Sequence, residues 1–254
     1  MTDSAMQSVS CPLCQSQEST LIGTKKAWGE TFEYHRCLSC ELIFDPVVPS
    51  QELFDQAYAG GFTVRNIHRK TLKLMPIIFY TKIKRFFKGI KEPIKFLDIG
   101  SNAGYFTESA RRLGCESHGI ELNAEAVSFA KKKYPQSNYH NTTIQEFANK
   151  GLTFDIIYCS EVIEHVPDIH GFTEAIRKVS HPNTTLFLTT PDTGHYKVPK
   201  DLMSWREVIA VEHLRLFNKK NMAQLLQDHD YRIKFSYPML RANQRHFCKP
   251  ITKD

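Results

Sequence analysis

Long apolar runs are missing from this sequence of 254 residues, and its first ten residues lack the apolar segment of a secretory signal. A helix that spans a bilayer needs about 20 predominantly apolar residues, and no stretch approaches that length. We therefore expect a cytoplasmic protein. A hydrophobic content of 41% suffices for a packed core, and the length suits a small domain followed by one of standard size.

The cysteine content lacks the even number and regular spacing of a disulfide framework, because there are seven. Four of them form two Cys-x-x-Cys pairs, and each pair can present two thiolates to one ion. Two pairs complete a tetrahedral zinc shell and leave no open position for chemistry, which predicts a structural zinc ribbon. The spacing is not that of an iron–sulfur ferredoxin. The predicted ligands are Cys11, Cys14, Cys37 and Cys40.

Acidic residues are almost missing between residues 61 and 95, where ten lysines and arginines stand against Glu92 alone. The whole chain has a net charge of +6, so its basicity is local to this segment. Residues 64–89 look helical, with a break or kink expected at Pro76. One interpretation is a solvated helix face. The other is an anionic partner: a phosphorylated or nucleotide-linked acceptor, RNA, or an acidic membrane surface.

The pattern of the chain changes twice. The run Asp45-Pro46-Val47-Val48-Pro49 breaks regular structure and indicates a linker, and apolar strands alternate with amphipathic helices from Pro93 onward. Such alternation predicts a doubly wound, mostly parallel sheet of the α/β class. Strands are expected near 94–99, 116–121, 153–160 and 184–190, and helices near 103–113, 123–133, 168–179 and 218–228. The predicted divisions are a zinc ribbon at 1–48, a basic helical linker or lid at 49–92, and the doubly wound α/β domain at 93–254.

The segment Asp98-Ile99-Gly100-Ser101-Asn102-Ala103-Gly104 follows an apolar strand and opens a helix. Its small residues let a ligand approach the backbone at the carboxyl edge of the sheet, where doubly wound proteins bind nucleosides. The G-x-G-x-x-G pattern of a dinucleotide site is missing, so pyrophosphate binding is poorly supported. Asp98 instead places a carboxylate suited to an ammonium group. Glu121 ends the next strand, where it can accept hydrogen bonds from both hydroxyls of a ribose.

A third motif is the segment Phe154-Asp155-Ile156-Ile157-Tyr158-Cys159-Ser160-Glu161-Val162-Ile163-Glu164-His165-Val166-Pro167-Asp168. Together with the turn at 98–104 and Glu121, this segment makes residues 93–250 resemble a class I S-adenosylmethionine-dependent methyltransferase. The resemblance implies a Rossmann-like sheet of seven strands, one of them antiparallel. It places the methionine part of the cofactor at residues 98–104, the ribose at Glu121 and the acceptor above residues 159–165. Asn102 stands where many members have glycine. The cofactor-binding residues that it implies are Asp98, Gly100, Asn102, Gly104, Tyr105, Glu121, Leu122 and Cys159.

Candidates for chemistry lie after the fourth strand and near Val211-Glu212-His213-Leu214-Arg215-Leu216-Phe217. His165 and His213 are candidate bases, because imidazole titrates near neutrality, and a structural role is the alternative for His165. Glu161 is a third candidate, and with Glu164 and the histidines it could hold a divalent ion, as in some relatives. Trp205 could cover an acceptor or pack in the core. Inert burial is the default for Cys159.

The whole chain also resembles a bacterial subgroup in which a Cys-x-x-Cys ribbon precedes this catalytic domain. That resemblance implies a small-molecule or saccharide-type acceptor, with a structural Zn²⁺ and S-adenosylmethionine as the bound groups. An RNA methyltransferase is the main enzymatic alternative, because a ribbon with a basic helix occurs there. Few aromatics interleave with the basic residues, which weakens this alternative. A noncatalytic binding protein that keeps the fold is the alternative of another class.

Overall fold

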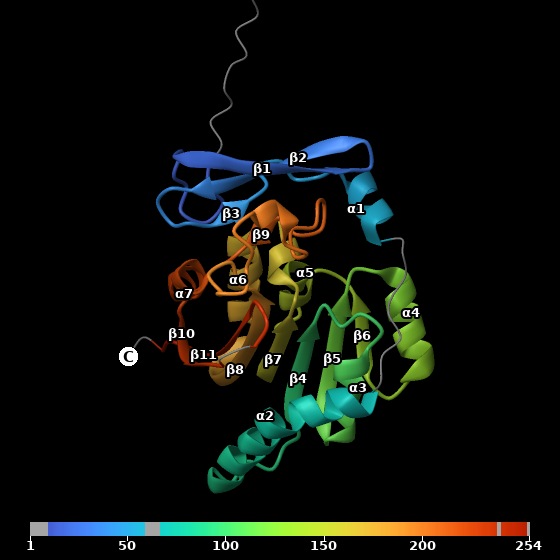
Figure 1. Ribbon diagram of the computed structural model, residues 1–254. Coiled ribbons are helices and arrows are strands. Elements are labelled where there is room, and N and C mark those ends of the chain that lie inside the picture. Colours follow the sequence, from blue (N-terminus) through green and yellow to red (C-terminus); the bar gives the residue numbers. More distant parts are fainter. Residues whose placement is uncertain (1–9, 59–66, 238–239, 253–254) are drawn as a thin grey trace, which may run out of the picture.

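A seven-stranded sheet forms the centre of the protein in the computed structural model, which describes residues 10–58, 67–237 and 240–252. The strand order is β10-β11-β8-β7-β4-β5-β6 (Figure 1). Of the strands described in this sheet, only β11 runs antiparallel to both its neighbours, which confirms the predicted doubly wound class. The strands are β4 (Ile94–Ile99), β5 (Cys115–Glu121), β6 (Asn138–Asn141), β7 (Phe154–Ser160), β8 (Ser180–Pro191), β10 (Tyr231–Ser236) and β11 (Asn243–Pro250).

Helices cover both faces of this sheet, because successive residues of its central strands point to opposite sides. Phe96 and Tyr158 face one apolar cluster, whereas Leu97 and Cys159 face another. Helices α2 and α3 pack on the first cluster, and α5, α6 and α7 on the second. The helices that flank the sheet are α2 (Ile67–Phe87), α3 (Tyr105–Arg112), α4 (Ala124–Lys133), α5 (Ile144–Ala148), α6 (Ile169–Lys178) and α7 (Lys219–Asp228).

A second sheet has four strands and lies across one end of the molecule (Figure 1). Three strands belong to the predicted ribbon, and the fourth, β9, comes from the far part of the chain. Leu13 packs in the same apolar cluster as the large sheet. The ribbon segment is therefore joined to the rest of the protein by backbone pairing and by a shared core. The elements are β1 (Ser19–Ala27), β2 (Glu30–Cys37), β3 (Ile43–Phe44) and β9 (Arg215–Leu216), followed after β3 by α1 (Gln51–Tyr58).

Helix α2 lies at the other end of the molecule (Figure 1). It continues through Pro76 without the expected break. Arg65 of the basic segment lies outside the described residues. No helix in the described parts of the chain is both long and apolar enough to cross a membrane.

Candidate active site

The turn after β4 has the backbone that its small residues predict. Gly100, Asn102 and Gly104 all have positive φ, at 69°, 47° and 78°. A Cβ atom on Gly100 would lie 2.5 Å from Cγ2 of Val162, and one on Gly104 would lie 2.7 Å from the Tyr139 ring. Both positions therefore require glycine. The close approach of Val162 also places the loop after β7 directly beside this turn.

Asp98 is buried at the end of β4 and holds the first turn of α3. Its Oδ2 accepts hydrogen bonds from the backbone N–H of Thr107 at 3.1 Å and from the Thr107 hydroxyl at 2.8 Å. Burial raises the pKa of the Asp98 carboxyl to about 7. The predicted contact with an ammonium group stays a prediction. Tyr105, at the start of the same helix, is buried and meets the Tyr134 ring edge to face.

The carboxylate of Glu121 joins two strand ends. One oxygen accepts from the backbone N–H of Asn102 at 2.8 Å, and the other from the N–H groups of Leu122 at 2.8 Å and Asn123 at 3.0 Å. The structure thus brings Glu121 to the β4 turn, and its contact with a ribose stays a prediction. The Leu122 side chain is 69% exposed beside it.

Glu161 and Cys159 are not members of the group that Glu164 forms with the two histidines. Cys159 is fully buried in β7, and burial raises the pKa of its thiol well above the usual value, which fits the inert role. The Glu161 carboxylate accepts hydrogen bonds from Thr189 of β8 at 2.7 Å and from Asn243 of β11 at 2.9 Å. These two partners were not found from the sequence, because no local motif marks them.

His165 and His213 lie together although 47 residues separate them in the chain. Nδ1 of His165 lies 2.9 Å from the Glu212 carbonyl oxygen, and Nδ1 of His213 lies 2.7 Å from that of Glu207. Because a carbonyl oxygen only accepts, each Nδ1 carries the proton, and each Nε2 of a neutral ring keeps a lone pair. Burial, with the neighbouring His213, lowers the pKa of His165 to about 3, and burial also lowers that of His213.

Glu164 completes a three-residue group with these histidines, whose ligand atoms all lie within 4.8 Å of one another. Its carboxylate is fully buried, and one oxygen accepts from the Thr190 hydroxyl at 3.0 Å. No donor within the described chain reaches the other oxygen, Oε1. Burial raises the pKa of Glu164 well above its usual value. One carboxylate with two imidazoles is a mixed oxygen and nitrogen set that fits a divalent cation.

Trp205 belongs to the core. It is 6% exposed in an apolar cluster that also holds Phe32 and Tyr34 of the ribbon segment. Of its two interpretations, packing is the one that the structure shows.

The four ribbon cysteines converge as predicted. Sγ of Cys11 lies 3.5 Å from that of Cys40, and Sγ of Cys14 lies 3.5 Å from that of Cys37. All four sulfur atoms lie within 4.8 Å of one another. The backbone N–H of Cys40 also points to Cys37 Sγ at 3.5 Å, the kind of contact that supports a metal thiolate. This arrangement fits a tetrahedral zinc ion.

Comparison with known proteins agrees with this geometry. Residues 71–234, more than half of the chain, match the family model described as a methyltransferase domain, and the chain belongs to this family. The ubiquinone biosynthesis O-methyltransferase of Bartonella tribocorum is 37% identical over 101 residues, which are 38% of this chain and 41% of that protein. That of Mesorhizobium japonicum is 34% identical over 103 residues, 39% of this chain and 41% of that protein. The chain thus spans about two fifths of the length of these curated relatives.

Solved structures show the same fold at low sequence identity. An S-adenosylmethionine-dependent methyltransferase from Clostridium acetobutylicum has a TM-score of 0.54 and 11% identity, over 79% of this chain and 97% of that one. The 1,6-didemethyltoxoflavin-N1-methyltransferase of Burkholderia thailandensis, solved with bound 1,6-didemethyltoxoflavin and S-adenosylhomocysteine, has a TM-score of 0.54 and 15% identity, over 85% and 98% of the two chains.

Proposed function

We propose that this protein transfers the methyl group of S-adenosylmethionine to an oxygen atom of a small-molecule acceptor. The family and the fold support the cofactor, and the matched segments of relatives named O-methyltransferases support the choice of oxygen. The observation that carries the proposal is the pair of neutral imidazoles, His165 and His213, of which His165 lies three residues after Val162, the side chain that abuts the Gly100 turn.

Methyl transfer is an in-line displacement, and much of its rate comes from positioning the acceptor against the methyl carbon. A hydroxyl acceptor also has to lose a proton. In the proposed reaction, Nε2 of His213 takes that proton while the acceptor oxygen bonds to the methyl carbon and the carbon–sulfur bond breaks, because His165, with a pKa of about 3, is a weak base at neutral pH. The products are the methyl ether and S-adenosylhomocysteine, and the imidazolium then releases its proton to water.

Residues 98–104 with Glu121 would hold the cofactor in this scheme. Because Glu121 already accepts three backbone N–H groups, it fixes both loops before a ribose hydroxyl arrives. A divalent cation at Glu164, His165 and His213 would supply a second way to lower the pKa of an acceptor hydroxyl. Treatment with a chelator distinguishes imidazoles that act as bases from imidazoles that act as metal ligands. Activity that falls with a chelator and returns with Mg²⁺ or Mn²⁺, at constant zinc content, would make them ligands instead of bases.

The four ribbon cysteines bind one structural zinc ion in this proposal. Four thiolates would fill the tetrahedral coordination shell of the zinc ion, so the ion would stabilise the fold and take no part in methyl transfer. The proposed catalytic region, residues 93–254, would therefore depend on a ribbon that shares its core.

The deciding experiment incubates the protein and trideuteromethyl-labelled S-adenosylmethionine with a cell extract and follows the label by mass spectrometry. We expect a labelled small molecule whose fragments carry the label on oxygen. A Glu121→Ala preparation is the matched control for background labelling. Label found only in digested RNA would replace this proposal with the RNA alternative. Cofactor binding without any labelled product, across extracts that contain the true acceptor, would favour a noncatalytic role.

A further inference from the structure

One side of helix α2 carries large apolar side chains that the fold leaves in solvent. Phe86 and Phe87 are 78% and 82% exposed. On the opposite side of the helix, Leu74, Ile77 and Ile78 are buried against the sheet. The helix thus has two apolar sides, and only one is used by the core. The exposed stripe, spaced three or four residues apart along one line of the helix, consists of Leu72, Met75, Phe79, Ile83 and Phe86.

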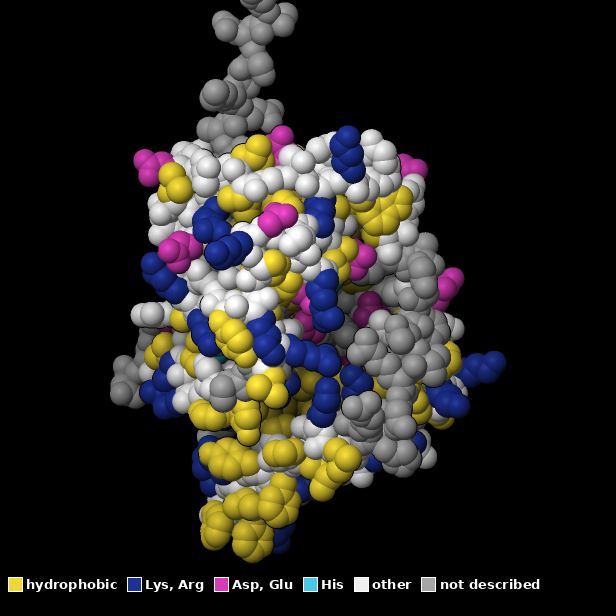
Figure 2. Space-filling model, viewed as in Figure 1, with side chains coloured by type: hydrophobic (Ala, Val, Ile, Leu, Met, Phe, Trp, Pro, Cys, Tyr) yellow, Lys and Arg dark blue, Asp and Glu magenta, His cyan; other side chains and the backbone are white. Residues whose placement is uncertain are grey.

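Figure 2 shows hydrophobic side chains gathered over the end of the molecule that α2 forms, with lysine and arginine side chains beside them. Soluble proteins rarely expose contiguous apolar patches of this kind unless the patch binds something. By helical geometry, Lys82 borders the exposed stripe on one side and Lys84 on the other. Between residues 67 and 92 the sequence has one acid, Glu92, whose carboxylate lies 3.9 Å from Arg85.

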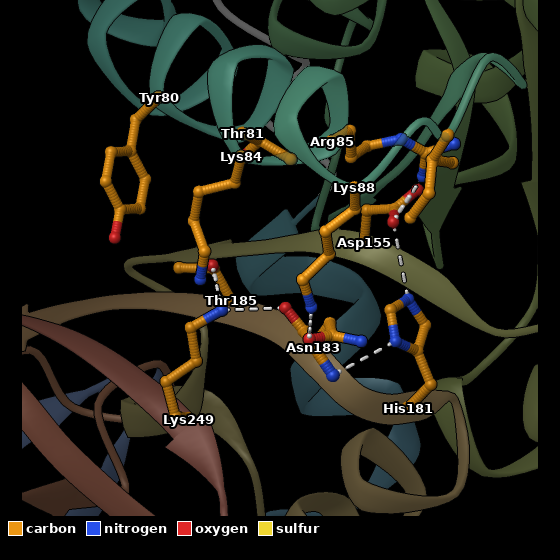
Figure 3. A pocket seen from close by; sticks show the side chains of 11 residues that line it. Tyr80, Thr81, Lys84, Arg85, Lys88, Asp155, His181, Asn183, Thr185 and Lys249 are labelled. Carbon is orange, nitrogen blue, oxygen red and sulfur yellow. Dashed lines mark hydrogen bonds and ion pairs between the residues drawn. The ribbon is translucent and has the colours of Figure 1, made fainter.

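A basic pocket lies between α2 and the strands β8 and β11, and Figure 3 shows Lys84 of α2, Lys88 just after this helix and Lys249 of β11 pointing into it. Nζ of Lys249 donates to the Asn183 carbonyl oxygen and to the Thr185 hydroxyl, both at 2.7 Å. Burial, together with the charges of Lys84 and Lys88, lowers the pKa of Lys249 to about 8.

Asp155 also lines this pocket, but its carboxylate pairs with Arg85 at 2.6 Å and with His181 at 3.4 Å. The three lysines therefore share no carboxylate among the described residues that line the pocket. An anionic oxygen placed between them would offset their mutual repulsion.

We propose that helix α2 docks on an anionic membrane surface, with its exposed stripe in the interfacial layer and with Lys84, Lys88 and Lys249 at lipid phosphates. Apolar residues flanked by lysines are the pattern of a helix that lies in the plane of a membrane. The long lysine side chains can reach the phosphates while aromatic rings enter the layer beneath. This docking is independent of the proposed methyl transfer.

Charge decides between this surface and the other candidate partners. In a symmetric dimer through α2, the lysine rows of two copies would face each other with Glu92 as the one acid in residues 67–92, and the cost of that repulsion disfavours a second copy. RNA would satisfy the lysines but would leave aliphatic Leu72, Met75 and Ile83 against a charged backbone. An anionic lipid layer satisfies both the lysines and the exposed stripe.

The test is co-sedimentation of the full chain with vesicles of phosphatidylcholine alone and with vesicles of phosphatidylcholine and phosphatidylglycerol in equal parts. We expect binding to the anionic vesicles only, weakened by added salt. The triple variant Phe79→Ser/Phe86→Ser/Phe87→Ser should bind more than about tenfold more weakly. Lys84→Glu/Lys88→Glu should lose about as much. The matched control is Leu38→Ser/Val47→Ser, which removes two exposed apolar side chains of the ribbon region and should bind like the unchanged protein.

Equal binding to both kinds of vesicle, or none to either, would overturn the proposal. So would a triple variant that binds as tightly as the unchanged protein, because charge alone would then explain the adsorption. Sedimentation equilibrium gives the remaining outcome: a dimer that the triple variant abolishes, in a protein that does not bind vesicles, would assign the exposed stripe to a second copy.

Discussion

The imidazole rings of His165 and His213 meet edge to face, with their centroids 4.6 Å apart and their planes at 82°. The two rings come from different segments, which are held together by a 2.8 Å hydrogen bond from the Leu214 N–H to the Glu164 carbonyl oxygen. Nδ1 of each ring also donates a hydrogen bond to a backbone carbonyl oxygen. The fold therefore holds these two neutral imidazoles, the candidate bases, in place before any acceptor arrives.

Replacing His165 or His213 by Ala should lower turnover by about 10²–10⁴-fold if that imidazole takes the acceptor proton. Cofactor affinity should stay nearly unchanged, because neither ring lies in the 98–104 turn. Turnover is measured with the identified acceptor, and affinity by calorimetry with S-adenosylhomocysteine. His181→Ala, which removes an imidazole from the α2 side of the sheet, is the control. A loss of tenfold or less in both single variants would return both histidines to structural roles.

Glu121→Ala should weaken cofactor binding by at least about tenfold, because two charge-assisted hydrogen bonds to a ribose contribute roughly 1.5–3 kcal/mol each before water compensates. The variant also frees three backbone N–H groups, so its fold is checked by circular dichroism. Glu125→Ala, which removes an exposed carboxylate from the next helix, is the matched control. Unchanged affinity in calorimetry would remove Glu121 from the cofactor site.

One zinc ion per chain is expected by elemental analysis of protein purified without chelator. Cys37→Ser/Cys40→Ser should lose it, and Cys115→Ala, at a buried cysteine outside the cluster, should keep it. Because Leu13 and Cys11 pack in the cluster that supports the large sheet, metal loss should lower the melting temperature of the whole protein. Zinc content that survives the double substitution would contradict the assignment.

His246 should make the protein less stable in acid. Its ring is 1% exposed, and burial, with a smaller effect from Lys219, lowers its pKa to about 4 from the ordinary 6.5. The unfolded chain binds this proton at a higher pH than the folded chain does. The stabilisation is thus complete above pH 6.5 and is lost as the pH falls through 4. Between pH 6.5 and 4, the free energy of unfolding of the unchanged protein should fall by about 3 kcal/mol more than that of His246→Gln. Urea titration at each pH measures this difference. Parallel curves for the two proteins would exclude this effect.

Much of the fold could be predicted from local patterns, and the misses have physical causes. The β4, β5 and β7 strands lie where apolar runs indicated them. Helix α3 starts at Tyr105 instead of 103, because Gly104 has a left-handed backbone. Strand β11 could not be located, since its inward positions include polar Gln244 and His246 and give no hydrophobic alternation.

The sequence by itself determined the two Cys-x-x-Cys turns and the strand-turn-helix at 98–104, because both depend on residues close together in the chain. Tertiary structure decided which distant groups meet. It paired β3 with β9, and it set Glu164 with the two histidines while Glu161 turned to Thr189 and Asn243. It also decided which apolar side of α2 is buried. Helical periodicity defines both sides of a helix, and only packing against the sheet selects one of them.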